Sequence, residues 1–464
     1  MFMKNVGVMS LGCPKNRLDT EVMLGLLHAA GYVLVPEDLA ELIIVNTCGF
    51  IQEAKEEAIE TTLEAARYKD TARCRFLIMA GCFSQRYVYE AAAEFPEVDF
   101  FMGVDDVPHI VSICRQLENG TASSRISATL LANRPSQYLY DHTVPRTVLG
   151  ARHSVYLKIS EGCRYRCSFC AIPLIRGSLR SRSMQSVLSE ASALVETGTS
   201  EILLIAQDTT SYGIDRGGTP LIVPLLQRLS DIRGLQWIRL MYAYPSNFDL
   251  PLMQLMAERE NICSYIDLPL QHIDDSILHA MRRGVSEQKT RHLLEQLRRE
   301  IPGLVLRSSL IVGFPGETDA VFQKLEDFVR DTRFDRLGVF AYSHEEGTPA
   351  CDLPGQIPAE VAQERRQQLM RIQQEISLQK NQSLIGSVQN VLIDGVSRES
   401  DLLLEGRLQG QAPDIDGVVY ITEGNTEQGR FEKVLVTEAL PYDLVGKILS
   451  ESSESVGKIM IENA

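Results

Sequence analysis

The sequence of 464 residues has no run of about 18 apolar residues, which argues against a membrane-spanning helix. Its first residues, MFMKNVGVMSLGCPKN, lack the small-residue cleavage site of a secretory signal and indicate a first β-strand instead. Positive charge is also scarce, because 46 basic residues face 61 acidic ones and the net charge is -15. Such a chain as a whole repels polyanions and attracts basic partners. We therefore expect a cytoplasmic protein without a membrane partner.

A fourth cysteine is missing from the most informative stretch, EGCRYRCSFCAIPLIRGSLRSR, at 161–182. Its three thiols, Cys163, Cys167 and Cys170, form a C-x3-C-x2-C array that can converge on one metal centre. A structural zinc site takes four closed ligands, and the only histidine nearby is His153. Thiolates favour soft metals, and a cubane iron-sulfur cluster normally takes four cysteines. Three thiols therefore predict a cluster with one iron free to bind another group.

Acidic residues are absent between positions 162 and 182, where five arginines are found. Local positive charge favours thiolate over thiol and offsets the charge of an anionic cluster. A disulfide, or a zinc knuckle with solvated arginines, is the alternative interpretation of this stretch. Ten cysteines in a chain from a reducing compartment indicate metal or redox chemistry before disulfides.

With Phe169 just before its last cysteine, the array resembles the signature of the radical S-adenosylmethionine (radical SAM) enzymes. The resemblance implies that the free iron of a 4Fe-4S cluster chelates S-adenosylmethionine, and that an electron from the cluster splits the sulfonium. The deoxyadenosyl radical so formed removes hydrogen from unactivated carbon. Cys163, Cys167 and Cys170 are then the catalytic and metal-binding residues, and Phe169 is a candidate contact of S-adenosylmethionine.

Short apolar runs alternate with helical periods from about 6 to 118, which predicts a parallel sheet with helices outside it. Buried strands are expected at 6–11, 42–46 and 76–80. Each is followed within two residues by a cysteine beside a glycine: Cys13, Cys48 and Cys82. Ligands bind at the carboxyl ends of parallel strands, so the three thiols should converge. Three buried structural cysteines are the alternative.

The segments SLGCPKNRLDTE, NTCGFIQEAKEEAI and AGCFSQRY resemble the three cysteine motifs of the methylthiotransferase N-terminal domain. This resemblance implies a second, auxiliary 4Fe-4S cluster on Cys13, Cys48 and Cys82. Cys74 and Cys114 lack the placement at a strand end, and we assign them to packing or to the surface.

Six further strands, separated by helical patterns, are expected in the second half of the chain. They are placed at 155–159, 202–206, 237–241, 265–268, 305–312 and 337–342. Six βα units suggest a partial (β/α)6 barrel, which is the radical SAM core. Chemistry in such barrels gathers at the C-terminal strand ends, and the three-cysteine loop follows the first of these strands.

Polar residues at other strand ends are candidate cofactor contacts. In the family, residues after the second strand touch the amino group of S-adenosylmethionine, which implies Gln207 and Asp208 here, although this pair departs from the usual acidic motif. The glycine turn after the fifth strand approaches the adenine, which implies Gly313 in IVGFPGETD. His272 and His344, which follow the fourth and sixth strands, are expected to be hydrogen-bonded structural histidines.

Residues 387–449 differ from the α/β pattern before them. Five short alternating strands with glycine-bearing turns predict a small antiparallel β-barrel. The segment resembles a TRAM domain, the usual nucleic-acid or substrate-binding tail of methylthiotransferases. From 381 to 450 there are five basic and eleven acidic residues, a net charge of -6. A surface that binds RNA needs the opposite sign, so direct RNA binding is not expected to dominate.

The expected fold is therefore an α/β multidomain protein. Its parts are a methylthiotransferase N-terminal domain with a parallel sheet at 3–120, a linker at 121–150, a radical SAM core at 151–380 and a TRAM barrel at 381–450.

Methylthiotransferases have a tRNA branch, which modifies an adenosine beside the anticodon, and a protein branch, which modifies the β-carbon of an aspartate in ribosomal protein uS12. The acidic charge favours a basic ribosomal protein as partner. The spellings GCPKN, NTCGFI, KISEGC and PLQHID resemble the uS12 branch, the RimO type. A tRNA methylthiotransferase and a non-catalytic iron-sulfur or zinc module are the alternatives.

For the uS12 branch, the resemblance implies a division of labour between the two clusters. A flavodoxin- or ferredoxin-like donor reduces the radical SAM cluster, and the radical takes a hydrogen from the aspartate β-carbon. The auxiliary cluster carries the sulfur that bonds to that carbon. A second S-adenosylmethionine supplies the methyl group.

Overall fold

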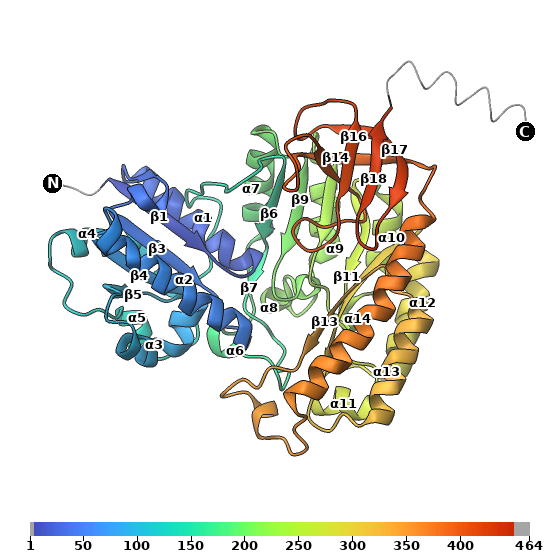
Figure 1. Cartoon of the computed structure of the whole chain (residues 1–464), viewed down its shortest axis with the longest axis horizontal. Helices are drawn as coiled ribbons and strands as arrows, with labels where there is room; N and C mark the ends of the chain where they lie inside the picture. The colour runs from blue at the N-terminus through green and yellow to red at the C-terminus, as the bar shows by residue number, and fades with distance from the viewer. Residues whose placement is uncertain (1–3, 450–464) are drawn as a thin grey trace, which may run out of the picture.

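The computed structural model describes residues 4–449 (Figure 1). An N-terminal domain lies beside a larger central domain, and a small β-barrel packs on one end of the central domain. Positions 3 and 450, where the first and last predicted domains begin and end, lie outside the described residues. No helix within 4–449 combines the length and the apolar character that crossing a membrane requires.

The N-terminal domain is a five-stranded parallel sheet in the order β2-β1-β3-β4-β5. The strands are β1 (Asn5–Ser10), β2 (Val33–Leu34), β3 (Leu42–Thr47), β4 (Phe76–Gly81) and β5 (Phe100–Phe101). The helices are α1 (Pro14–Ala29), α2 (Gln52–Thr71), α3 (Cys82–Glu94), α4 (Ile110–Glu118) and α5 (Ala128–Leu131), with 3-10 turns η1 (Glu37–Leu39) and η2 (Val104–His109). All six residues of β3 are buried, as a parallel strand between layers of helices requires. The predicted parallel sheet is confirmed.

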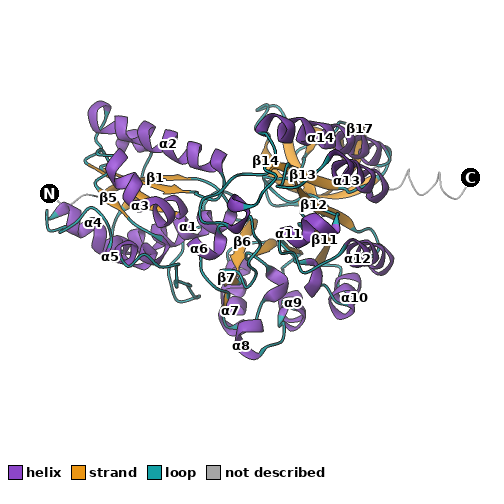
Figure 2. Ribbon diagram, turned by 90° about the horizontal axis from the view of Figure 1, so that it is seen from below, coloured by secondary structure: helices purple, strands orange, loops and turns teal. Residues whose placement is uncertain are grey.

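The central domain is a six-stranded parallel sheet in the order β13-β12-β11-β10-β9-β6. Its strands are β6 (Ser154–Lys158), β9 (Glu201–Ile205), β10 (Trp237–Leu240), β11 (Ile262–Asp267), β12 (Val305–Val312) and β13 (Arg336–Ala341). Chain order equals spatial order, so the strands form an open arc with helices on its outer side (Figure 2). This is the predicted partial (β/α)6 barrel.

Helices cover the outside of the arc, and a two-stranded hairpin lies at its mouth. The helices of the central domain, of which α6 lies at the mouth, are α6 (Ile172–Ile175), α7 (Met184–Glu196), α8 (Ile214–Gly217), α9 (Ile222–Ser230), α10 (Leu250–Glu258), α11 (Asp275–Ala280), α12 (Glu287–Glu300), α13 (Asp319–Thr332) and α14 (Ala359–Gln382). The 3-10 turns are η3 (Thr209–Ser211), η4 (Pro245–Asn247) and η5 (Pro349–Asp352). The hairpin pairs β7 (Ser160–Glu161) with β8 (Arg180–Ser181) and so brackets the three-cysteine loop.

The C-terminal strands close into a five-stranded barrel in the order β14-β15-β16-β18-β17. They are β14 (Val388–Val396), β15 (Leu404–Leu408), β16 (Val419–Glu423), β17 (Phe431–Ala439) and β18 (Leu444–Ile448). Branched residues such as Val391, Ile393 and Val434 fill its interior. The predicted small barrel is confirmed, with one correction: β16 and β18 pair in parallel, whereas the other pairs are antiparallel.

The stretch 121–150, predicted as a linker, works as a strap between the two larger domains. It is mostly irregular, and its Arg146 is buried between two carboxylates. Arg146 lies 2.7 Å from Glu21 of α1 and 2.7 Å from Glu190 of α7. The guanidinium thus holds a helix of each domain, because removing one partner of a buried ion pair leaves the other charge uncompensated.

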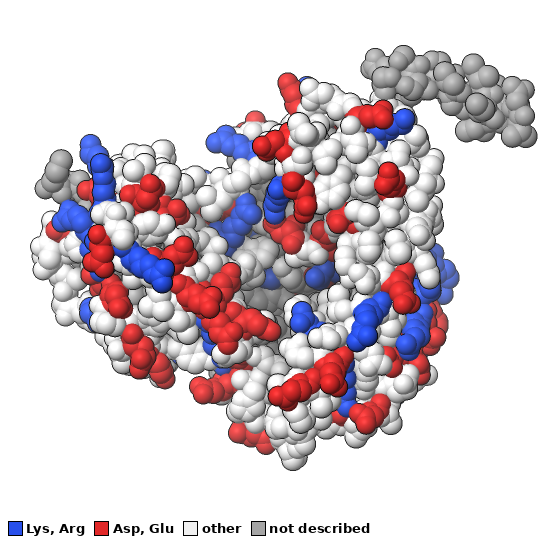
Figure 3. Space-filling model, viewed as in Figure 1, with Lys and Arg blue, Asp and Glu red and all other residues white. Residues whose placement is uncertain are grey.

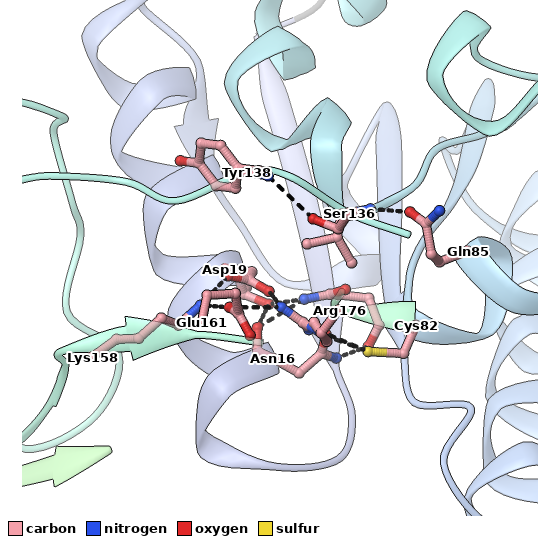
Figure 4. Close-up of polar contacts among 12 residues, drawn as sticks. Asn16, Asp19, Cys82, Gln85, Ser136, Tyr138, Lys158, Glu161 and Arg176 are labelled. Atoms are coloured by element: carbon pink, nitrogen blue, oxygen red, sulfur yellow. Dashed lines mark hydrogen bonds and ion pairs between the residues drawn. The ribbon is translucent and has the colours of Figure 1, made fainter. Parts of the chain in front are cut away.

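A second set of buried charges joins α1 to the mouth of the central domain (Figure 4). Asp19 of α1 lies 2.6 Å from Lys158 of β6 and 2.6 Å from Arg176, which follows α6. Both cations also pair with Glu161 of β7, at 2.7 and 3.2 Å. Two cations and two anions are balanced in this cluster, so the two domains are held in one relative position.

The β-barrel docks on the central domain through Arg407 of β15. This buried guanidinium lies 2.8 Å from Glu201 of β9 and 2.7 Å from Asp394 of β14. Close to it, Trp237 of β10 packs edge-on against Phe431 of β17, with ring centroids 4.8 Å apart. The chain's single tryptophan therefore reports on this interface.

Replacing Arg407 should loosen the docked barrel. We expect Arg407→Met to lower the free energy of undocking by about 3–5 kcal/mol, because Glu201 and Asp394 lose a buried partner. Urea titration followed by Trp237 fluorescence measures this. Arg398→Met is the matched control, since Arg398 is 81% exposed and its ion pairs contribute less than about 1 kcal/mol. Equal urea midpoints for the two variants would contradict the expected role of Arg407.

The pH dependence of stability should carry the signature of Glu161. Burial opposes its ionisation, but Lys158 and Arg176 hold the pKa of its carboxyl well below the usual value. Its stabilising contribution is therefore complete above the unfolded pKa of about 4.3 and is lost as pH falls below that value. We expect the urea midpoint to fall more steeply between about pH 5 and pH 3 in the wild type than in Glu161→Gln. Parallel pH profiles would argue against this ion cluster.

Candidate functional site

The three N-terminal cysteines meet at the carboxyl ends of β1, β3 and β4. Cys48 directly follows β3, and Cys82 is the first residue of α3. Cys13 precedes α1 and lies three residues beyond β1, one more than predicted, because β1 ends at Ser10. Gly12 has φ of 81°, and an added Cβ would lie 2.6 Å from the Cβ of Cys48, so only glycine lets these loops touch.

Cationic and apolar surroundings compete over these thiols. Burial raises the pKa of Cys48 to about 12 and also raises that of Cys82. Arg176 opposes this at Cys82, because its Nε and Nη2 donate to the sulfur over 3.3 and 3.2 Å (Figure 4). One auxiliary thiol is therefore held by a guanidinium from the central domain.

The second trio lies in the loop between β7 and β8. Burial raises the pKa of Cys163 to about 11 and raises that of Cys170. Arg283 lies 3.8 Å from the sulfur of Cys167 through Nη1 and stacks 4.2 Å above the ring of Tyr244. Each trio thus has one buried arginine that donates to one of its thiols.

Two of the five arginines near the second trio in sequence have their contacts elsewhere. Arg176 faces the other trio, and Arg182 pairs with Glu190 at 2.6 Å. The cation that acts on Cys163 and Cys170 is Arg283, which follows α11 far along the chain. Part of the positive charge beside these thiols therefore comes from a distant segment.

The two trios are neighbours across the domain boundary. Cys82 packs against Ala171 and Ile175, and Ala171 directly follows Cys170. Within 4–449 no group of three or more His, Cys, Asp or Glu side chains is arranged as the ligand set of a single metal ion. In a cubane each thiolate binds a different iron, so its ligands are spread more widely. Thiols with one arginine donor per trio fit that chemistry.

The two residues after β9, Gln207 and Asp208, differ in whether they keep a free hydrogen-bond acceptor. Both oxygens of Asp208 accept hydrogen bonds, one from Thr210 and the other from Ser211 of the same turn and from Asn247 of η4. Gln207 donates its Nε2 to Glu161, and its buried Oε1 has no hydrogen-bond partner among the described residues. The geometry therefore leaves an acceptor free at Gln207, whereas Asp208 caps η3.

Packing against α14 by itself explains why position 313 is a glycine. Its φ is 71°, and an added Cβ would lie 2.3 Å from the Cβ of Ala362 in α14. Phe169 is half-buried and packs against the apolar cluster that contains Met281 and Phe314. These contacts neither require nor prevent a ligand beside the two residues.

The two histidines make the kind of contact expected of structural histidines. His272 is fully buried, its Nδ1 accepts from the amide of Asp274, and its Nε2 lies 3.3 Å from Glu317. His344 is exposed, and its Nε2 lies 3.3 Å from the sulfur of Cys351. Among the described residues, neither histidine forms a hydrogen bond with a member of the two trios.

Three further residues near the trios, Lys15, Lys158 and Arg283, are not distinguished by the sequence pattern. Lys15 lies two residues after Cys13 in GCPKN, and Lys158 lies in KISEGC. Their place inside these cysteine-containing motifs is the sequence feature that could have identified both lysines. Arg283 lies in MRRGVS, where nothing in the sequence distinguishes it from the exposed Arg282.

Family models match three parts of the chain. Residues 5–103 match the Uncharacterized protein family UPF0004, residues 157–329 match the Radical SAM superfamily, and residues 385–449 match the TRAM domain. Among solved structures, the radical S-adenosylmethionine methyltransferase TsrM from Kitasatospora setae, with cobalamin and a [4Fe-4S] cluster bound, aligns with a TM-score of 0.55. That alignment has 16% identity and covers 84% of this chain and 81% of TsrM, so it supports the fold alone.

Curated relatives align over nearly the whole chain. The ribosomal protein uS12 methylthiotransferase RimO of Syntrophotalea carbinolica is 48% identical over 97% of this chain and 98% of its own length. RimO of Geotalea uraniireducens is 48% identical over 96% and 98%, and RimO of Geobacter sulfurreducens is 47% identical over 96% and 99%. The chain therefore belongs to the RimO family of ribosomal protein uS12 methylthiotransferases, which are radical SAM enzymes.

Proposed function

We propose that this chain methylthiolates the β-carbon of an aspartate in ribosomal protein uS12, with S-adenosylmethionine as radical source and methyl donor. The observation that carries the proposal is the meeting of two cysteine trios at one domain boundary, in a chain that is 48% identical to a RimO over 97% of its length. A ribosomal substrate places this activity in the cytoplasm.

Each trio holds one 4Fe-4S cluster in this proposal. Cys163, Cys167 and Cys170 bind the radical SAM cluster, and Cys13, Cys48 and Cys82 bind the auxiliary cluster. When bound, the first cluster with S-adenosylmethionine supplies the hydrogen-abstracting radical, and the second supplies the sulfur. The supporting feature of the chain is the pair of buried arginines beside the thiols, since hydrogen bonds to cluster sulfurs tune iron-sulfur sites.

Gln207 orients the amino group of S-adenosylmethionine in this scheme. Glu161 accepts from the Gln207 amide nitrogen, so the amide oxygen faces away from that contact and is left as an acceptor. An ammonium group has three donors and suits such an acceptor. Asp208 supports the turn instead, and the proposed adenine contact at Gly313 rests on the family resemblance alone.

The charge of the β-barrel indicates the substrate protein, and the reduction of the radical SAM cluster requires an electron donor. The β-barrel exposes six acidic side chains against three basic ones, which favours a basic protein over RNA. Acidic groups are spread over the face in Figure 3, with basic groups interspersed. We infer a flavodoxin- or ferredoxin-like protein as the electron donor, because the radical SAM cluster needs single electrons of low potential.

Cysteine variants should separate the two sites. Cys163→Ala, Cys167→Ala or Cys170→Ala should abolish deoxyadenosine formation from S-adenosylmethionine by the reduced enzyme. Cys13→Ala, Cys48→Ala or Cys82→Ala should spare deoxyadenosine formation but stop methylthio product. Cys74→Ala, whose thiol lies before β4 at the opposite end of the strand, is the control and should retain both. Chromatography of deoxyadenosine and intact mass of uS12 measure the two outcomes.

The substrate can be tested in cells. Intact mass of uS12 and nucleoside analysis of tRNA, with and without the gene, distinguish the uS12 and tRNA branches. A mass change confined to tRNA adenosine, or bound zinc in place of two iron-sulfur clusters, would overturn the proposal.

A further inference from the structure

Lys15 is a buried cation with no anionic partner among the described residues. Its side chain is 8% exposed, and no hydrogen bond or ion pair joins its ammonium to residues 4–449. The Nζ atom instead lies 3.1 Å from the centroid of the Tyr242 ring. Buried charges are normally paired, so a lysine held only against an aromatic face is unusual.

The carboxylates around Lys15 are engaged by other cations. The acidic groups that act on its charge are, largest first, Cys13, Asp267 and Glu161, and Cys13 is assigned to the auxiliary cluster. Asp267 lies 2.6 Å from Arg307, and Glu161 lies 2.7 Å from Lys158. Lys15 therefore has no carboxylate partner of its own within residues 4–449.

Its position is the boundary between the two domains that carry the trios. Lys15 follows Cys13 by two residues, and its partner ring, Tyr242, lies two residues beyond the end of β10, at the mouth of the central domain. Burial raises the pKa of the Tyr242 phenol, and the neighbouring Cys13 raises it further, which places Tyr242 close to Cys13 as well. Figure 3 shows the molecule hollowed between the two domains, with basic side chains inside the hollow and acidic ones along its rim.

Tyr242 is held in a special backbone conformation to meet this lysine. Its φ is 59°, a value that bulky residues rarely adopt and that functional sites often contain. The conformation is fixed from both sides, since its amide donates to Asp267 over 3.2 Å and its carbonyl accepts from the Thr209 amide over 3.0 Å. The backbone that carries the ring is thus fixed, and the ring packs against the ammonium.

We propose that Lys15 binds the side-chain carboxylate of the substrate aspartate and holds the adjacent β-carbon at the boundary between the two trios. The inference rests on the proposed function and adds the residue that selects an acidic side chain. A carboxylate would supply the missing ion pair, and its carbon is bonded directly to the β-carbon that reacts. A neutral asparagine of the same shape would leave the ammonium unpaired.

A double-substitution experiment tests this pairing. The full chain, loaded with both clusters and without reductant, is titrated with unmodified uS12 and with uS12 in which the target aspartate is replaced by asparagine. We expect the wild type to bind the aspartate form about tenfold or more tightly than the asparagine form. Lys15→Met should bind both forms alike, with the Kd of the wild type for the asparagine form.

Lys289→Met is the matched control, since it makes the same substitution on the exposed face of α12. It should discriminate between the two uS12 forms as the wild type does. Iron content and thermal midpoint of each variant check that folding and cluster loading are unchanged. Any effect of Lys15→Met on the auxiliary cluster acts on both uS12 forms equally, so it cancels in the ratio of the two Kd values.

The outcomes separate the two ideas. If Lys15→Met retains the wild-type ratio, or if the wild type does not distinguish the two uS12 forms, the role of Lys15 is overturned. If the wild type discriminates but reduced enzyme makes no methylthiolated uS12, the proposed function fails while the carboxylate site stands. Should Lys15→Met fail to load iron, Lys15→Arg replaces it, and we expect discrimination to persist because the charge is kept.

Discussion

The guanidinium of Arg176 contacts both domains that carry the cysteine trios. It pairs with Asp19 on one side and Glu161 on the other, and it donates two hydrogen bonds to the thiol of Cys82. All of these groups are buried, and an uncompensated charge there costs several kcal/mol. The fit of the two domains and the placement of an auxiliary ligand therefore cannot vary independently.

The same device occurs at the other trio, where Arg283 reaches Cys167. Burial disfavours thiolates, as the raised pKa values of Cys48 and Cys163 show, and metal binding must remove those protons. Arginine suits this position because it does not lose its own proton. Its charge stays constant whether the sulfur beside it is a thiol or a metal ligand.

The alternation of short apolar runs with helical periods was enough to predict both parallel sheets. A strand covered by helices on both faces is a continuous apolar run, as β3 is. The placement of Cys48 and Cys82 at strand ends followed from the same topology. The charge partners could not be predicted in this way. Arg407 is buried in an ion pair and Arg398 is exposed, yet both look like surface arginines in the sequence.

Long sequence separation hid other parts of the site. Arg283 acts on Cys167 across 116 residues, and only the fold brings them together. Gly313 fitted a ligand-binding turn, but the nearest constraint on it is the methyl group of Ala362 in a helix whose packing could not be foreseen. Local pattern thus predicted the elements, while contacts between elements decided which side chains are available.

The ion pairs that join the domains have a consequence for the order of synthesis. Glu21 and Asp19 leave the ribosome early, but Arg146, Lys158 and Arg176 follow them by 125, 139 and 157 residues. Until those cations emerge, Asp19 lacks the buried counterions of the folded chain, and Glu21 has only Arg17 of its own helix. The N-terminal sheet is translated first, yet the thiol of Cys82 gains its hydrogen bonds from Arg176 only after the mouth of the central domain has been translated.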